Sequence, residues 1–183
     1  MKISKKILVG CLALAVALSS VVFLHASALS TLMTSRQIQQ IRDNCVTAKN
    51  TLNQLHASDA LLRVNIGQTY ESISTKMMEK FNKRASNNNY NNDSLVSVTN
   101  AYGQTLDVFR SDYIAYEEHL STALSINCQD QPVSFFDAVA LARAERNQVH
   151  TDVVRLNQYL DKYQTALNQF EKDYQDAVKG AKQ

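Results

Sequence analysis

The stretch from Val139 to Ala177, VALARAERNQVHTDVVRLNQYLDKYQTALNQFEKDYQDA, decides the fold class of this chain. One set of positions in it recurs in alternating steps of three and four residues, which places the set on one face of a helix. The repeat lasts about five heptads, and a period of 3.5 residues sustained that far is typical of coiled coils. The set is apolar or aromatic except at Arg146, and comprises Val139, Ala142, Arg146, Val149, Val153, Leu156, Leu160, Tyr163, Leu167, Phe170, Tyr174 and Ala177.

A similar pattern predicts a first helix over residues 34–84, opened by a capping box at Thr34-Ser35-Arg36-Gln37. The phase of its repeat shifts at Ile66-Gly67, and a glycine costs about 1 kcal/mol relative to alanine inside a helix. The helix therefore either continues through Gly67 or breaks there, and a break would give a four-helix arrangement. The repeat comprises Ile38, Ile41, Cys45, Ala48, Leu52, Leu55, Asp59, Leu62 and Ile66, then Tyr70, Ile73, Met77 and Phe81.

Two connections separate the predicted helices. Residues 85–94 are rich in asparagine and serine and lack apolar periodicity, so we expect a loop there. A turn at Asp130-Gln131-Pro132 separates a second helix, 94–127, from a third, 134–179. Because short connections make neighbouring helices antiparallel, we predict an all-α fold: an N-terminal signal or anchor helix followed by an antiparallel three-helix, coiled-coil-like bundle.

Residues 1–28 are typical of an export leader. They contain three lysines and no acidic residue, an apolar run over 7–24, and the small-x-small sequence Ala26-Ser27-Ala28 that a signal peptidase recognises. The run would form a helix of about 27 Å, which also suffices for a membrane anchor. Cleavage and anchoring both stay open. In either case the lysines keep the N-terminus in the cytoplasm, so we predict that residues 29–183 lie outside it.

The charge balance and the missing motifs exclude several functions. Of 19 lysines and arginines, three lie in the leader, which leaves 16 against 17 acidic residues that all follow residue 28. Mixed charges of this kind do not form the basic surface that nucleic acids require. The chain also lacks a glycine-rich phosphate loop, an HExxH motif and a nucleophile elbow. We therefore expect no catalysis, no cofactor, no metal site, no small-molecule ligand and no nucleic-acid partner.

Cys45 and Cys128 are the two cysteines that follow the leader. An even cysteine count in an exported chain favours a disulfide over a metal site. Cys45 lies 39 residues before Arg84 and Cys128 lies 34 residues after Ser94. Antiparallel pairing of the first two helices would therefore bring them to within about 8 Å along the axis. We predict a Cys45–Cys128 disulfide.

Asp59 and Arg146 are the charged exceptions in two otherwise apolar repeats. Counted from the predicted disulfide level, the two residues differ in height by less than one helical turn. We predict that they form a buried ion pair, because a lone buried charge would cost several kcal/mol. The alternative is that both side chains extend to solvent at the edge of the helix contact.

The segment Asn127-Cys128-Gln129, followed by the alanine- and arginine-rich residues 136–144, carries a family resemblance. With the leader and the early Cys45, it resembles a loosely defined group of uncharacterised secreted helical proteins of bacteria, over roughly residues 34–178. The resemblance implies an exported helical bundle and no functional motif.

Two functions fit these observations. One is a structural or protein-interaction module of the cell envelope, with a protein partner or self-association, and membrane contact through the N-terminal helix if the leader is not cleaved. The other is an extracytoplasmic chaperone, which would need a concave surface with exposed apolar residues or a basic cavity. We prefer the first function because the three apolar faces are expected to bury one another.

Overall fold

The computed structural model describes residues 33–180, and these residues form helices and no strand. The prediction of an all-helical chain is confirmed for this part, while the predicted leader lies outside the described residues. None of the helices within 33–180 has both the length and the apolar character needed to cross a membrane. The elements are α1 (Ser35–Asp43), α2 (Cys45–Ser72), the π-helix η1 (Ile73–Met78), α3 (Glu79–Asn87), α4 (Asp93–Ser125) and α5 (Pro132–Gly180).

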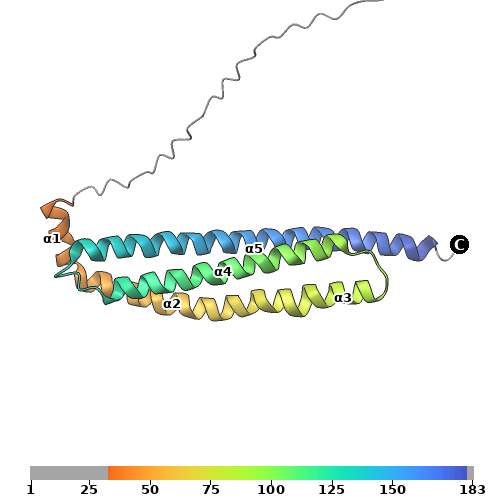
Figure 1. The fold of residues 1–183 in the computed structure, drawn as a ribbon, viewed down its shortest axis with the longest axis horizontal. Coiled ribbons are helices and arrows are strands. Elements are labelled where there is room, and N and C mark those ends of the chain that lie inside the picture. The colour runs from red at the N-terminus through yellow and green to blue at the C-terminus, as the bar shows by residue number, and fades with distance from the viewer. Residues whose placement is uncertain (1–32, 181–183) are drawn as a thin grey trace, which may run out of the picture. The chain divides into compact units, whose positions relative to one another are not determined.

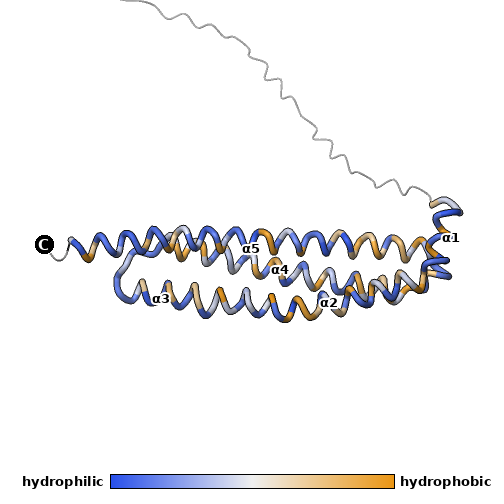
Figure 2. The backbone as a smooth tube through the Cα atoms, turned by 180° about the vertical axis from the view of Figure 1, so that it is seen from behind, coloured by the Kyte–Doolittle hydropathy of each residue, from blue (hydrophilic) through white to orange (hydrophobic). Residues whose placement is uncertain are grey.

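Helix α4 is the central element of the fold. In Figures 1 and 2, α2 and α3 follow one another as one long rod, and α4 lies between this rod and α5. Both neighbours approach α4, but no Cα atom of α2, η1 or α3 lies within 8 Å of a Cα atom of α5. Accordingly α4 buries more side chains than α2 or α5, and these are Leu95, Thr99, Tyr102, Thr105, Leu106, Phe109, Tyr113, Tyr116, Leu120 and Ala123.

The first predicted helix, 34–84, is not continuous. The Thr34 capping box is present, but the helix is interrupted at Asn44. The Asn44 side chain donates a hydrogen bond to the Gln40 carbonyl at 2.8 Å, in competition with the regular helix bonds. Arg42 donates to the Gln129 carbonyl at 3.0 Å and thereby links α1 to the turn before α5. The sequence pattern missed this interruption because the apolar repeat runs through it.

The expected irregularity at Gly67 lies instead at η1. Gly67 sits inside α2 without a break, and the π-helix begins six residues later at Ile73. The wider turns of a π-helix keep residues four apart on one face, and the buried residues here follow that spacing: Tyr70, Ser74, Met78 and Asn82. The phase change at η1 leaves the predicted contact residue Met77 exposed, and Leu62 and Ile66 of α2, before η1, are exposed as well, which corrects the sequence prediction.

Buried polar side chains join the helices near the loop at 88–92. Asn82 on α3 donates to Thr99 on α4 at 2.8 Å and accepts from the Tyr163 hydroxyl of α5 at 3.1 Å. Asn92 donates to the Asn82 carbonyl at 2.7 Å. Because buried amides must find partners, this arrangement fixes the relative positions of α3, α4 and α5 at this end.

The Cys45–Cys128 disulfide closes the opposite end, as predicted. The two Cα atoms are 5.5 Å apart, and both cysteines are buried together with Phe135 of α5. The bond joins the first residue of α2 to the segment between α4 and α5. A disulfide of this kind is typical of proteins from oxidising compartments.

Removing the disulfide should destabilise the fold substantially. The bond closes a loop with a sequence separation of 83 residues, and a loop of that size contributes roughly 4 to 5 kcal/mol in the chain-entropy model. We expect Cys45→Ser combined with Cys128→Ser to lower the free energy of unfolding by about 3 to 5 kcal/mol in urea titrations. The reduced wild-type protein should show the same loss. Two titratable thiols in the oxidised protein would contradict the pairing.

Candidate functional site

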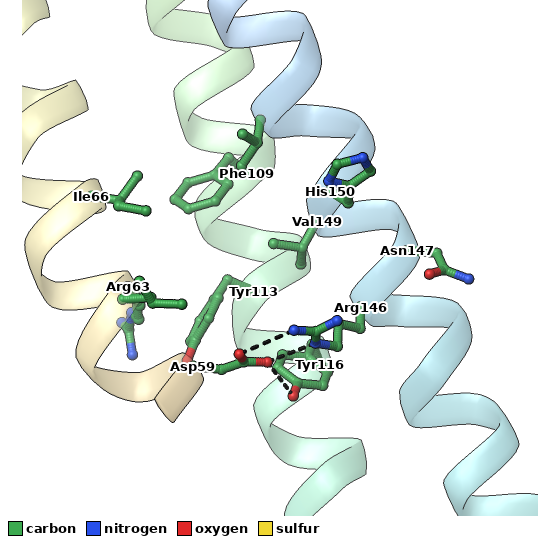
Figure 3. A pocket seen from close by; sticks show the side chains of 12 residues that line it. Asp59, Arg63, Ile66, Phe109, Tyr113, Tyr116, Arg146, Asn147, Val149 and His150 are labelled. Carbon is green, nitrogen blue, oxygen red and sulfur yellow. Dashed lines mark hydrogen bonds and ion pairs between the residues drawn. The ribbon is translucent and has the colours of Figure 1, made fainter. Parts of the chain in front are cut away.

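A groove lies over α4, between α2 and α5, in the middle of the molecule (Figure 3). Its volume is about 460 Å³. It exists because α2 and α5 both pack on α4 while their Cα atoms stay more than 8 Å apart, so that side chains alone span the space between them. The lining residues are Asp59, Leu62, Arg63 and Ile66 of α2, Phe109, Tyr113 and Tyr116 of α4, and Arg146, Asn147, Val149, His150 and Val153 of α5.

The structure brings Asp59 and Arg146 together across this groove. Arg146 Nε donates to Asp59 Oδ2 at 2.7 Å and Nη2 donates to Oδ1 at 3.2 Å, which makes a bidentate pair. The pair is buried on one side only: Asp59 is buried, whereas the Arg146 side chain remains 48% exposed. Arg146 therefore extends from the surface of α5 to the buried carboxylate of Asp59. Of the two alternatives left open by the sequence, the pairing applies to both residues and the exposure to solvent applies to Arg146 alone.

Tyr116 completes the binding of the Asp59 carboxylate. Its hydroxyl donates to Asp59 Oδ2 at 2.8 Å from the floor of the groove. Burial disfavours the charged form of Asp59, but the hydrogen bonds from Arg146 and Tyr116 outweigh burial and hold the pKa of Asp59 below its ordinary value. Burial and the adjacent Asp59 raise the pKa of Tyr116. Asp59 is thus ionised and Tyr116 is neutral at neutral pH.

A second set of polar contacts, centred on Glu117, lies beside the contacts of Asp59. The Tyr113 hydroxyl donates to Glu117 Oε1 at 2.6 Å, and His56 Nε2 lies 2.9 Å from Glu117 Oε2. The Arg63 guanidinium lies over the Tyr113 ring, 4.8 Å from its centroid. Glu117 is therefore engaged by two partners, while Arg63 has no carboxylate partner within residues 33–180.

Exposed apolar side chains gather on the α2 side of the groove. Leu62 is 50% exposed and Ile66 is 38% exposed beside the groove, whereas exposed Leu61 and Val64 lie on a different face of α2, because successive helix residues turn by about 100°. No side chain between Leu61 and Thr69 is buried. The apolar residues of α2 that border the groove are therefore open to solvent.

Asp152 of α5 is a buried carboxyl that the sequence pattern did not indicate. Its side chain is 0% exposed, and Oδ2 has no hydrogen-bond partner within residues 33–180. Gln148 donates to Oδ1 at 3.5 Å, and Arg155 lies 3.7 Å from the same oxygen. Burial, together with the neighbouring carboxyl of Asp112 on α4, raises the pKa of Asp152 to about 6.

The polar residues of the groove do not form a metal-ligand set. Within residues 33–180, no three histidine, cysteine, aspartate or glutamate side chains gather as a cation would require. Comparisons with protein-family models, curated proteins and solved structures find no match. The resemblance to secreted helical proteins stays a prediction, and the groove must be interpreted from its own chemistry.

Sequence reasoning found two members of this site and missed the others. Asp59 and Arg146 stood out because each interrupts an apolar repeat. Tyr113 and Tyr116 carry no sequence pattern that marks a site, and only the structure shows the contacts of their hydroxyls with Glu117 and Asp59. Arg63 gave no signal, because a lone arginine on a helix is ordinarily a solvated side chain.

A double-mutant cycle should show coupling between Asp59 and Arg146. Arg146→Ala leaves a buried carboxylate with Tyr116 as its remaining partner, so we expect a loss of about 2 to 3 kcal/mol in unfolding free energy. Half-exposed Arg146 can turn to solvent in Asp59→Ala, so that variant should lose about 1 to 2 kcal/mol. The double variant should lose clearly less unfolding free energy than the two single variants added together.

Arg143→Ala, at an exposed position of the same helix, is the control. If the losses of Asp59→Ala and Arg146→Ala simply add in the double variant, the pairing is contradicted.

Asp152 should make the protein less stable as the pH rises from about 4 to about 6. Its folded-state pKa is above the ordinary aspartate value of 3.8, so the folded state binds the extra proton in this window. The resulting stability is present at low pH and is lost as the pH rises through the folded-state pKa, by roughly 2 to 3 kcal/mol.

Asp152→Asn should flatten this part of the stability profile in urea titrations at fixed pH values. Asp161→Asn changes an exposed aspartate on the same helix and should leave the slope unchanged. If the Asp152→Asn profile keeps the wild-type slope, Asp152 titrates normally and is not the cause.

Proposed function

We propose that residues 29–183 form a non-catalytic, extracytoplasmic helical module that binds another protein of the cell envelope. The observation that carries this proposal is the groove over α4, with its exposed apolar residues Leu62 and Ile66. Full burial of a leucine or isoleucine side chain contributes about 1.5 to 3 kcal/mol of stabilisation. Leu62 and Ile66 are already partly buried, so a partner that covers them would gain roughly half of that free energy from each. An acidic side chain, an arginine and aromatic rings around the same groove can supply orientation.

The proposal includes an antiparallel three-helix bundle as the scaffold. Its support comes from the order of contacts: along the α2–α3 rod, Cys45, Asp59 and Asn82 meet successively earlier residues of the chain, Cys128, Tyr116 and Thr99. Opposite directions of the two helices account for this order. The disulfide and the leader-like residues 1–28 support a place outside the cytoplasm, either released or anchored.

An extracytoplasmic chaperone is the second candidate, and one observation favours it. Such a protein needs a concave surface with exposed apolar residues, and the groove has that character. A chaperone would bind many different unfolded proteins at this surface, whereas an interaction module would bind one folded partner. The number of partners therefore distinguishes the two functions.

Photo-cross-linking in intact cells tests the proposal and separates these functions. A photoreactive amino acid is incorporated in place of Leu62, in the groove, or in place of Val46, which is exposed on α2 outside it. We expect one discrete cross-linked species from Leu62, in the envelope fraction, and none from Val46. Pretreatment of the cells with protease from outside should remove this species.

The other outcomes are equally informative. A broad series of cross-linked products from Leu62 alone would favour the chaperone. Equal cross-linking from Leu62 and Val46, or a partner found in the cytoplasm, would contradict the proposed function.

A further inference from the structure

The groove carries one cation, Arg63, that no carboxylate within residues 33–180 neutralises. Of its charged residues, Arg146 and Asp59 neutralise each other through two hydrogen bonds. Arg63 lies over the face of the Tyr113 ring instead, and it has no carboxylate partner within residues 33–180. Glu117, which lies close by, is already engaged by Tyr113 and His56.

Stacking on Tyr113 leaves the binding capacity of Arg63 intact. A guanidinium that stacks on an aromatic ring uses its face, whereas its N–H donors lie in the plane at its edge. Those donors match the two oxygens of a carboxylate. Arg63 is exposed on the same α2 face as Leu62 and Ile66, so a carboxylate at Arg63 would lie beside the apolar part of the groove (Figure 3).

The size of the groove limits what can occupy it. The lining residues of α2 extend from Asp59 to Ile66, about 10 Å or two helical turns. A helix about 10 Å in diameter and equally long fills roughly 800 Å³, which exceeds the groove volume of about 460 Å³. A whole helix therefore does not fit into the groove. The groove can accommodate the side chains on one face of a short segment, that is, a few apolar side chains and one polar group.

Two other occupants fit this surface less well. A second copy paired symmetrically through the groove would offer Arg63 the same carboxylates, Asp59 and Glu117, and both are already engaged by other side chains. A small amphiphile is ordinarily enclosed over most of its surface, but Leu62 and Ile66 remain open to solvent at the rim.

Resting on the proposed function, we propose that the partner inserts a short apolar segment bearing one acidic residue, whose carboxylate pairs with Arg63. Leu62 and Ile66 contact the apolar side chains of this segment. Arg63 selects a segment with an acid at the matching position, and the Asp59–Arg146 pair closes one end of the groove.

Peptide binding to the oxidised protein tests this assignment by fluorescence anisotropy. The probes are labelled peptides of alanine, leucine and serine, about three helical turns long, with a central glutamate, glutamine or lysine. We expect the glutamate peptide to bind about tenfold more tightly than the glutamine peptide, and the lysine peptide to bind most weakly.

Three variants assign the effect to the groove. Arg63→Gln should remove the preference for glutamate while leaving the affinity for the glutamine peptide unchanged. Arg143→Gln, an exposed arginine of α5 outside the groove, should retain the preference. Leu62→Asn should weaken all three peptides, and circular dichroism should show that each variant is folded.

The contrary outcomes are distinct from failure of the proposed function. Equal binding of the glutamate and glutamine peptides, a preference that survives Arg63→Gln, or no binding of any peptide would overturn the inference. Cross-linking from Leu62 to one partner would still stand in each of these cases. A dimer in sedimentation that Leu62→Asn dissociates would assign the groove to a second copy and overturn the inference as well.

Discussion

The buried face of α4 is the constraint on which the rest of the structure depends. The α2–α3 rod packs against one side of this helix and α5 packs against the other, while the backbones of the two neighbours stay apart. Tyr102, Tyr116 and Leu120 of α4 are almost completely buried as a result. Burial of side chains of this size contributes about 1.5 to 3 kcal/mol each, so the attachment of both neighbours depends mainly on α4.

This arrangement explains why polar groups lie inside the molecule. Large tyrosines fill the space beneath the groove, and a buried hydroxyl must find an acceptor. Tyr116 finds Asp59 and Tyr113 finds Glu117, and each carboxylate in turn needs a cationic or donating partner. The resulting chain of contacts joins α2, α4 and α5 where their backbones do not meet. The same packing leaves Leu62 and Ile66 of α2 exposed beside the groove, and the proposed function rests on this surface.

Two devices keep the long helices aligned at their ends. The π-helix η1 changes the phase of the rod so that Met78 and Asn82 are buried against α4 and α5, whereas Leu62 and Ile66 stay exposed at the groove. The Cys45–Cys128 bond fixes the other end. Between these points the α2 segment from Leu61 to Thr69 buries no side chain, and segments with few buried contacts are the ones that adapt to a partner.

The sequence by itself determined the helical class, the second and third helices to within a few residues, and the pairing of Cys45 with Cys128. These features follow from local periodicity, from capping and turn residues, and from the cysteine count. It also singled out Asp59 and Arg146, because a charge in an apolar repeat needs a partner. Only the tertiary structure decided that Asn44 interrupts the first helix, that the phase changes at η1, and that Asp152 is buried while Leu62 is not. All of these features depend on which side of a helix contacts α4 and on how closely the neighbouring helix approaches. The apolar repeat in the sequence gives the spacing of the buried residues, but it carries no information on that distance.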